Sequence, residues 1–194
     1  MKICVFGAAS AHIDEKYIKA VEELGEKMAK RGHSLVFGAG GTGLMGAVAR
    51  GVKLGGGYVH GVVPSFFKEQ GVEQLFEECD KMTYTQTMRE RKAIMEDDAE
   101  AFIITPGGVG TFEELFEVIT LKQLNRHDKA IAFLNTDGYY DDFLKLMDTA
   151  CERKFITKSC LSLYEFFNDA DSVLDYLEGY VPHPIPFSRT KLGE

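Results

Sequence analysis

The sequence predicts a single α/β domain in which helices cover both faces of a doubly wound, mainly parallel, Rossmann-like sheet. Short β-rich runs alternate along the chain with longer segments of helical period. Because a strand, a helix and a second strand in succession form a parallel crossover, this alternation indicates a parallel sheet. The length of 194 residues and a hydrophobic content of 45% are sufficient for one compact core.

The expected elements follow in chain order. The runs that predict strands are KICVF, SLVF, YVHGVV, AFIIT and KAIAFL. Between the first two, apolar residues recur every three or four positions and predict a helix that begins after Asp14 and ends at Gly32. We expect residues 1–180 to form one domain and residues 181–194 an irregular tail. The same helical spacing predicts helices near residues 44–54, 86–97, 111–125, 139–153 and 169–178.

Charge and cysteine usage restrict the partners and the compartment. A formal net charge of -8 argues against a broad basic face for nucleic acid or for an anionic membrane. No window approaches the roughly 18 apolar residues that span a bilayer, and the run in MKICVFG is short. The four cysteines contain no C-x-x-C pair, which suits a reducing compartment. We therefore expect an unexported, cytoplasmic protein.

The histidines give no support for a metal centre. None of the five lies four residues from another, so we expect no metal site and place each histidine at the surface or at a helix end.

Three loops rich in glycine and alanine follow predicted strands: GAASA, GAGGTG and PGGVG. In a doubly wound sheet, ligands bind beyond the carboxyl ends of the strands, where the strand order reverses. One crevice lined by all three loops is the expected site.

The second of these loops matches the dinucleotide pattern G-x-G-x-x-G at Gly38, Gly40 and Gly43. The match is weak, because it does not follow the first strand and because the next strand ends in GVVP with no acidic residue for a ribose. No G-K-[ST] sequence supports a P-loop either. We therefore disfavour NAD and expect no cofactor.

The third loop is better suited to a phosphate group. Glycines allow backbone N–H groups to converge, and the helix expected to begin near Thr111 adds partial positive charge. A plain tight turn with Thr111 as N-cap is the alternative. Glu114 has two interpretations as well, since TFEE is a capping box, yet a carboxylate there would also stabilise a cationic ribosyl centre.

A basic segment, MRERKAIM, precedes this loop on a predicted helix. Its cations cannot share one face, so we place Arg91, Met88, Met95 and Lys92 nearer the inward side. Taken singly, each cation is better explained as part of a solvated helix surface.

The pair MRERK and PGGVGTFEE resembles the signature of the LONELY GUY family, the cytokinin riboside 5'-monophosphate phosphoribohydrolases, with its pattern P-G-G-x-G-T-x-x-E. The family's preceding arginine falls on Arg91, and GLMGAVARG resembles its second loop and helix. The resemblance covers roughly residues 1 to 180. Departures occur at Ala8, Ala9 and Ala39 and in TQTMRERK, so the identity of the base stays open. The name lysine decarboxylase, used for relatives, has no matching pyridoxal-lysine motif here.

The resemblance implies hydrolysis of the N-glycosidic bond of a nucleoside 5'-monophosphate in a homodimer, without a metal or a cofactor. It implies Glu114 and Arg91 as catalytic residues. The implied substrate-binding residues are Met88, Lys92, Gly107, Gly108, Val109, Gly110, Thr111, Gly40 and Gly41. Two alternatives stay open: a nucleosidase for AMP or general nucleotides, and a non-catalytic carrier of a phosphorylated ligand such as molybdenum cofactor.

Overall fold

The computed structural model describes residues 1–71, 74–183 and 185, and in this part of the chain seven parallel strands form one sheet. The strand order is β4-β3-β2-β1-β5-β6-β7. The strands are β1 (Lys2–Phe6), β2 (Ser34–Phe37), β3 (Val59–Pro64), β4 (Lys81–Thr85), β5 (Ala101–Ile104), β6 (Ala130–Leu134) and β7 (Glu165–Phe167). The expected doubly wound, Rossmann-like sheet is thereby confirmed.

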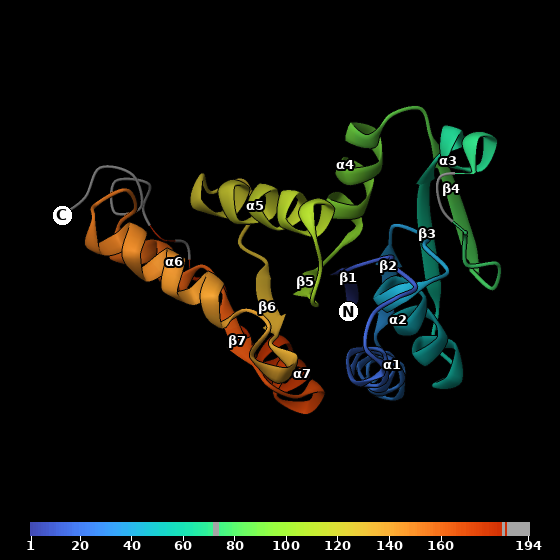
Figure 1. Ribbon diagram of the computed structural model, residues 1–194, viewed down its shortest axis with the longest axis horizontal. Coiled ribbons are helices and arrows are strands. Elements are labelled where there is room, and N and C mark those ends of the chain that lie inside the picture. The colour runs from blue at the N-terminus through green and yellow to red at the C-terminus, as the bar shows by residue number, and fades with distance from the viewer. Residues whose placement is uncertain (72–73, 184, 186–194) are drawn as a thin grey trace.

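Helices cover both faces of the sheet (Figure 1). One layer contains α1 (Glu15–Lys30), α2 (Gly43–Leu54) and α7 (Ala170–Gly179). The other contains α4 (Met88–Asp98), α5 (Val109–Gln123) and α6 (Asp141–Glu152). Successive side chains of a strand point to opposite faces of the sheet. Ile3 therefore packs against the first helical layer and Cys4 against the second. Short segments complete the chain: α3 (Ser65–Gln70) and the 3-10 turns η1 (Thr136–Gly138) and η2 (Lys158–Ser162).

The boundaries of the first helix are confirmed. The Asp14 carboxylate accepts a hydrogen bond from the Lys16 amide at 3.1 Å, and Gly32 follows the helix with φ of +79°. The five strands expected from the sequence are present, but β4 and β7 were missed. Both lie at the edges of the sheet, where a strand has one neighbour and does not need a continuous apolar run.

The expectation that every histidine lies at the surface or at a helix end is wrong for His60. This residue is the second of β3 and only 2% exposed. Its two ring nitrogens lie 2.8 Å from Asp98 Oδ2 and 2.8 Å from Thr83 Oγ1, and these contacts satisfy the buried ring. In the described part of the chain, no helix is long and apolar enough to cross a membrane.

The strand order reverses between β1 and β5, and the three small-residue loops meet there. The Ala8 amide donates to the Pro106 carbonyl at 3.1 Å, which joins the first loop to the third. The second loop joins through the Leu44 amide, which donates to the Ala8 carbonyl at 2.8 Å. Gly43, with φ of +58°, allows this approach, because a Cβ there would lie 2.6 Å from the same oxygen. This switch point is where ligands bind in such sheets.

Candidate active site

The PGGVG loop is held in place from the adjoining helical layer. The Tyr139 hydroxyl donates to the Gly107 carbonyl at 2.5 Å, and the Tyr140 hydroxyl donates to the Thr105 carbonyl at 2.7 Å. Tyr140 is 1% exposed, so the second bond lies in the core. Sequence reasoning missed both tyrosines, because the contact joins two connections that follow neighbouring strands and leaves no local pattern.

The start of α5 presents free backbone amides to solvent. Gly108 is the N-cap, and its carbonyl accepts the first helical hydrogen bond from the Phe112 amide at 2.9 Å. The amides of Val109, Gly110 and Thr111 therefore have no acceptor within the helix. Val109 is 86% exposed, and a Cβ added at Gly108 or Gly110 would meet nothing within 4 Å. This open, positively polarised end suits an anion.

The predicted capping box at TFEE is wrong, because α5 begins two residues earlier than Thr111. The extended backbone of Gly108 acts as the cap without a side-chain hydrogen bond. Thr111 instead packs inward with 4% exposure, and a Cβ on Gly107 would lie 2.1 Å from its Oγ1. Glu114 therefore lies beyond the first turn, and a capping role does not explain it.

Glu114 is a buried carboxyl group that faces a buried arginine. Its side chain is 11% exposed, and its Oε1 lies 4.0 Å from Arg91 Nη2. This separation exceeds a hydrogen bond, so the two groups interact through charge alone. Burial raises the pKa of Glu114 to about 7 even though Arg91 acts in the opposite direction. Burial thus has the larger effect, and the carboxyl group is poised to exchange a proton near neutral pH.

Arg91 is fixed by α4, by α3 and by the loop after β2. It is 6% exposed; its Nη1 lies 3.8 Å from the Met88 sulfur and its Cζ 5.7 Å from the centre of the Phe67 ring. The guanidinium lies directly over Gly38, where a Cβ would come within 1.6 Å of Nη2. The Arg91 Nε atom is buried and has no hydrogen-bond partner among the described residues. An oxygen of a ligand bound at the switch point would satisfy such a donor.

The sequence also predicted Lys92, Met88, Gly40 and Gly41 as substrate-binding residues. Lys92 forms ion pairs with Glu113 and with Glu117, the latter at 2.5 Å, so its ammonium ties α4 to α5. Met88 is 37% exposed. Gly40 and Gly41 pair with residues 74 and 75, and the Gly41 amide donates to the Gln74 carbonyl at 2.7 Å. Sequence reasoning placed the loop that contains Gly38 in the site but did not predict its contact with Arg91, and it did not place Phe67 there.

The second loop also contains the departure noted at Ala39. This residue has φ of +64° and is fully buried. The left-handed conformation costs a residue with a Cβ about 1 kcal/mol, which the surrounding packing offsets. A glycine would adopt this backbone conformation without that cost.

Replacing Gly38 by alanine is expected to reduce kcat/KM by roughly 10-fold or more, because the new Cβ displaces the guanidinium from Glu114. Stability should change little, since the displaced group is the end of a flexible side chain. Gly179→Ala is the matched control, because a Cβ there meets nothing within 4 Å. Steady-state kinetics and thermal unfolding of the two variants check this prediction, and wild-type kinetics in Gly38→Ala would contradict it.

No group of three or more histidine, cysteine, aspartate or glutamate residues within residues 1–71, 74–183 and 185 is arranged to hold a metal ion. At the switch point, the features that can bind a ligand are the amides of α5, the Arg91 guanidinium and the Glu114 carboxyl group.

Solved structures with the same fold include two molybdenum-cofactor proteins. The carrier protein of Chlamydomonas reinhardtii has a TM-score of 0.68 at 21% identity, with 91% of this chain and 95% of that chain covered. The cofactor-binding protein of Rippkaea orientalis has a TM-score of 0.69 at 18% identity, covering 91% and 94%. At these identities the likeness establishes the fold alone.

Sequence comparisons are more specific. A family model described as "possible lysine decarboxylase" matches residues 45–177. A probable cytokinin riboside 5'-monophosphate phosphoribohydrolase of Oryza sativa subsp. japonica is 40% identical over 98% of this chain and 77% of its own length. A cytokinin riboside 5'-monophosphate phosphoribohydrolase of Arabidopsis thaliana is 38% identical over 93% of this chain and 84% of its own length. Together with the motif at residues 106–114, these matches show that the chain belongs to the LONELY GUY family of cytokinin riboside 5'-monophosphate phosphoribohydrolases.

Proposed function

We propose that this protein is a hydrolase that cleaves the N-glycosidic bond of a cytokinin-type nucleoside 5'-monophosphate and releases the free base and ribose 5-phosphate. The observation that carries the proposal is the buried Glu114 carboxyl group facing Arg91, one helical turn from the free amides of α5. Relatives that are 38% to 40% identical and have this activity in their names support it.

In this proposal, the start of α5 binds the 5'-phosphate and the following turn contains the catalytic carboxyl group. The amides of Val109, Gly110 and Thr111 bind the 5'-phosphate, with Gly107 and Gly108 shaping the loop. Glu114 shares a helix face with Gly110, so its carboxyl group lies beside the ribose of a phosphate held at the helix start. There the carboxylate stabilises the positive charge that develops on the ribosyl ring, or accepts a proton from the attacking water.

Arg91 orients the substrate through charge-assisted hydrogen bonds, for which its unpaired Nε supplies one donor, and it acts on Glu114 through charge alone. The phosphate is remote from the glycosidic bond, and the free energy of its binding helps to lower the barrier to cleavage of that bond. In this proposal, Met88, Lys92, Gly40 and Gly41 border the substrate. Lys92 acts indirectly, by holding α4 against α5.

Two other functions remain to be separated from this one by experiment. A nucleosidase for AMP would use the same residues, whereas a carrier of molybdenum cofactor or another phosphorylated ligand needs only the glycine loops. A buried carboxyl group whose pKa is raised to about 7 favours catalysis over carriage. Incubation with AMP and with isopentenyladenosine monophosphate, followed by chromatography of the free bases, distinguishes the three. A carrier releases neither base, and preferential release of adenine would identify the general nucleosidase.

The 5'-phosphate is expected to be required. Two charge-assisted hydrogen bonds from the α5 amides correspond to roughly 100-fold or more in kcat/KM. Isopentenyladenosine monophosphate should therefore react at least that much faster than isopentenyladenosine, as measured by steady-state kinetics. Similar kcat/KM values for the two compounds would mean that this loop does not bind the 5'-phosphate.

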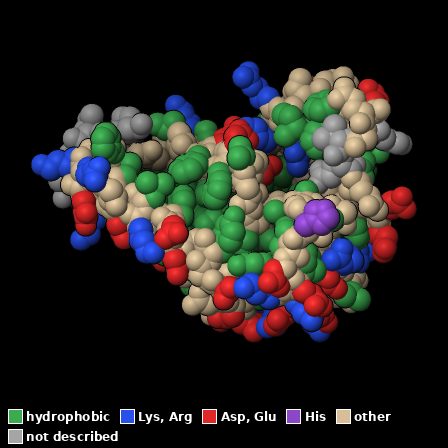
Figure 2. Space-filling view, in the orientation of Figure 1, with side chains coloured by type: hydrophobic (Ala, Val, Ile, Leu, Met, Phe, Trp, Pro, Cys, Tyr) green, Lys and Arg blue, Asp and Glu red, His purple; other side chains and the backbone are tan. Residues whose placement is uncertain are grey.

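We propose that the protein is a cytoplasmic homodimer that uses hydrophobic surface on α5 and α6. Figure 2 shows hydrophobic side chains gathered over these two helices, where Phe116 is 43% and Leu146 60% exposed. Sedimentation equilibrium at micromolar concentration should yield twice the chain mass of 21.6 kDa. A single species at the monomer mass would contradict the proposed dimer.

A further inference from the structure

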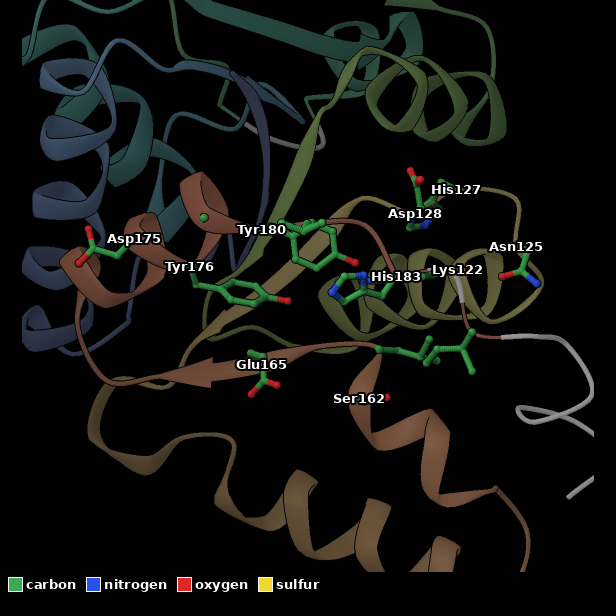
Figure 3. A pocket seen from close by; sticks show the side chains of 14 residues that line it. Lys122, Asn125, His127, Asp128, Ser162, Glu165, Asp175, Tyr176, Tyr180 and His183 are labelled. Atoms are coloured by element: carbon green, nitrogen blue, oxygen red, sulfur yellow. The ribbon is translucent and has the colours of Figure 1, made fainter. Parts of the chain in front are cut away.

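A cavity of about 600 Å³ opens at the end of α5 that is remote from the proposed active site. Lys122 lines it from the end of α5 and Asn125 from the turn that follows (Figure 3). Tyr176 lines it from α7 and Tyr180 from the residue after that helix. Lys122 comes eight residues after Glu114, which is about 12 Å along a helix axis. The proposed hydrolysis uses none of the residues of this cavity.

Lys122 is a buried cation without an anionic partner. It is 8% exposed and forms no hydrogen bond or ion pair with any of the described residues. Its ammonium lies 4.9 Å from the centre of the Tyr180 ring, a cation–π contact. Burial lowers the pKa of Lys122 to about 8, against a weaker opposing effect of Asp128, so the group is still mainly protonated at neutral pH. Such a cation is stabilised by any ligand that brings a negative charge to it.

The remaining titratable groups restrict the charge of that ligand. The carboxylates of Asp175, Glu165 and Asp128 belong to the lining, but in Figure 3 they point away from its centre. They lie at the rim and would repel a polyanion.

His127 adds little charge to the lining of the cavity. His127 uses both ring nitrogens, with Nε2 2.9 Å from the Val118 carbonyl and Nδ1 accepting from the Lys129 amide at 3.2 Å. Burial lowers the pKa of His127 to about 4, so its ring is neutral. The other histidine, His183, is exposed and lies at the cavity opening. A ligand with one negative charge therefore matches this site better than a phosphate ester with two.

Aromatic side chains provide the rest of the binding surface. In Figure 3 the rings of Tyr176 and Tyr180 face the interior with their hydroxyl groups directed inward. The two rings are 5.6 Å apart at an angle of 66°, and both line the cavity, so a planar ligand there can contact them.

We propose that this cavity is a second ligand site, which binds a small aromatic monocarboxylate with its carboxylate on the Lys122 ammonium and its ring against Tyr176 and Tyr180. The site is separate from the nucleotide crevice and independent of the proposed hydrolysis. Lys122 supplies the charge-assisted bond, and the rim carboxylates reject ligands of higher negative charge.

Calorimetric titration with benzoate, and with the isosteric neutral benzamide, tests the proposal. Benzoate should bind wild type at least about 10-fold more tightly than benzamide, because one charge-assisted hydrogen bond corresponds to that factor or more. Lys122→Met keeps the length of the side chain and should lower the benzoate affinity to that of benzamide. Lys19→Met removes an exposed lysine and is the matched control, with unchanged affinity expected.

Two further measurements locate the site. Glu114→Gln should bind benzoate as wild type does, and Lys122→Met should hydrolyse substrate at the wild-type rate. Equal affinities for benzoate and benzamide, or unchanged benzoate affinity in Lys122→Met, would overturn the proposal. Competition by AMP would overturn it too, because the probe would then occupy the nucleotide crevice. So would the absence of heat at roughly 10 mM benzoate, where a site with Kd near 1 mM is mostly filled.

Discussion

Replacing Glu114 by glutamine is expected to lower kcat by roughly 100-fold or more, because an amide neither accepts a proton from water nor stabilises a cationic ribosyl ring. The shape of the side chain is nearly unchanged, so the monophosphate should still bind. Single-turnover kinetics and a separate measurement of product binding distinguish the two effects.

Glu113→Gln is the matched control for this experiment. Glu113 is the adjacent residue on α5, but its side chain is 54% exposed and pairs with Lys92. Its replacement should leave kcat within a few-fold of wild type. If Glu114→Gln retained a rate that close to wild type, the carboxyl group would have no catalytic role and the proposed reaction at this site would fail.

The pH dependence of stability provides an independent test of the same residue. The folded-state pKa of Glu114 is about 7, raised from an ordinary value of 4.5. Between pH 4.5 and pH 7, Glu114 therefore binds more protons in the folded protein than in the unfolded chain. The resulting stabilisation of the fold is complete below pH 4.5 and is lost as the pH rises through 7. The shift corresponds to about 3 kcal/mol. Chemical denaturation should find Glu114→Gln more stable than wild type at pH 8.

Replacing Arg91 by methionine is expected to lower kcat/KM by roughly 100-fold, because charge-assisted hydrogen bonds to the substrate are lost. It should also raise the pKa of Glu114 further, since Arg91 is the nearest group that lowers it. Activity that depends on the Glu114 carboxylate rises with pH through its pKa, so the pH-rate profile should move to higher pH.

Arg89→Met provides the control, because Arg89 is an exposed residue of the same helix. It should change neither kcat/KM nor the pH-rate profile. An Arg91→Met variant with a lower rate but an unshifted profile would mean that Arg91 binds substrate without acting on Glu114.

The strands inside the sheet are buried on both faces and therefore appear in the sequence as continuous apolar runs. The alternation of these runs with helical segments was enough to predict the parallel sheet. The edge strands β4 and β7 escaped prediction because each has only one neighbouring strand and carries polar residues. At the candidate site, the motif predicted roles for Glu114 and the glycine loop, which stay predictions, but Thr111 was a convincing N-cap by residue type alone. Gly108 has no side chain to mark it as the true cap. The roles of Tyr139 and Gly38 depend on contacts between distant segments, which local spacing does not encode.

The contact between Gly38 and Arg91 also restricts how such a protein can change over generations. Any side chain at position 38 occupies the space in which the guanidinium lies. A lineage that acquires one must move its arginine to another position or lose the activity that depends on it. Positions 38 and 91 should therefore covary among relatives. A relative that has a larger residue in place of Gly38 is expected to lack the arginine at position 91 as well.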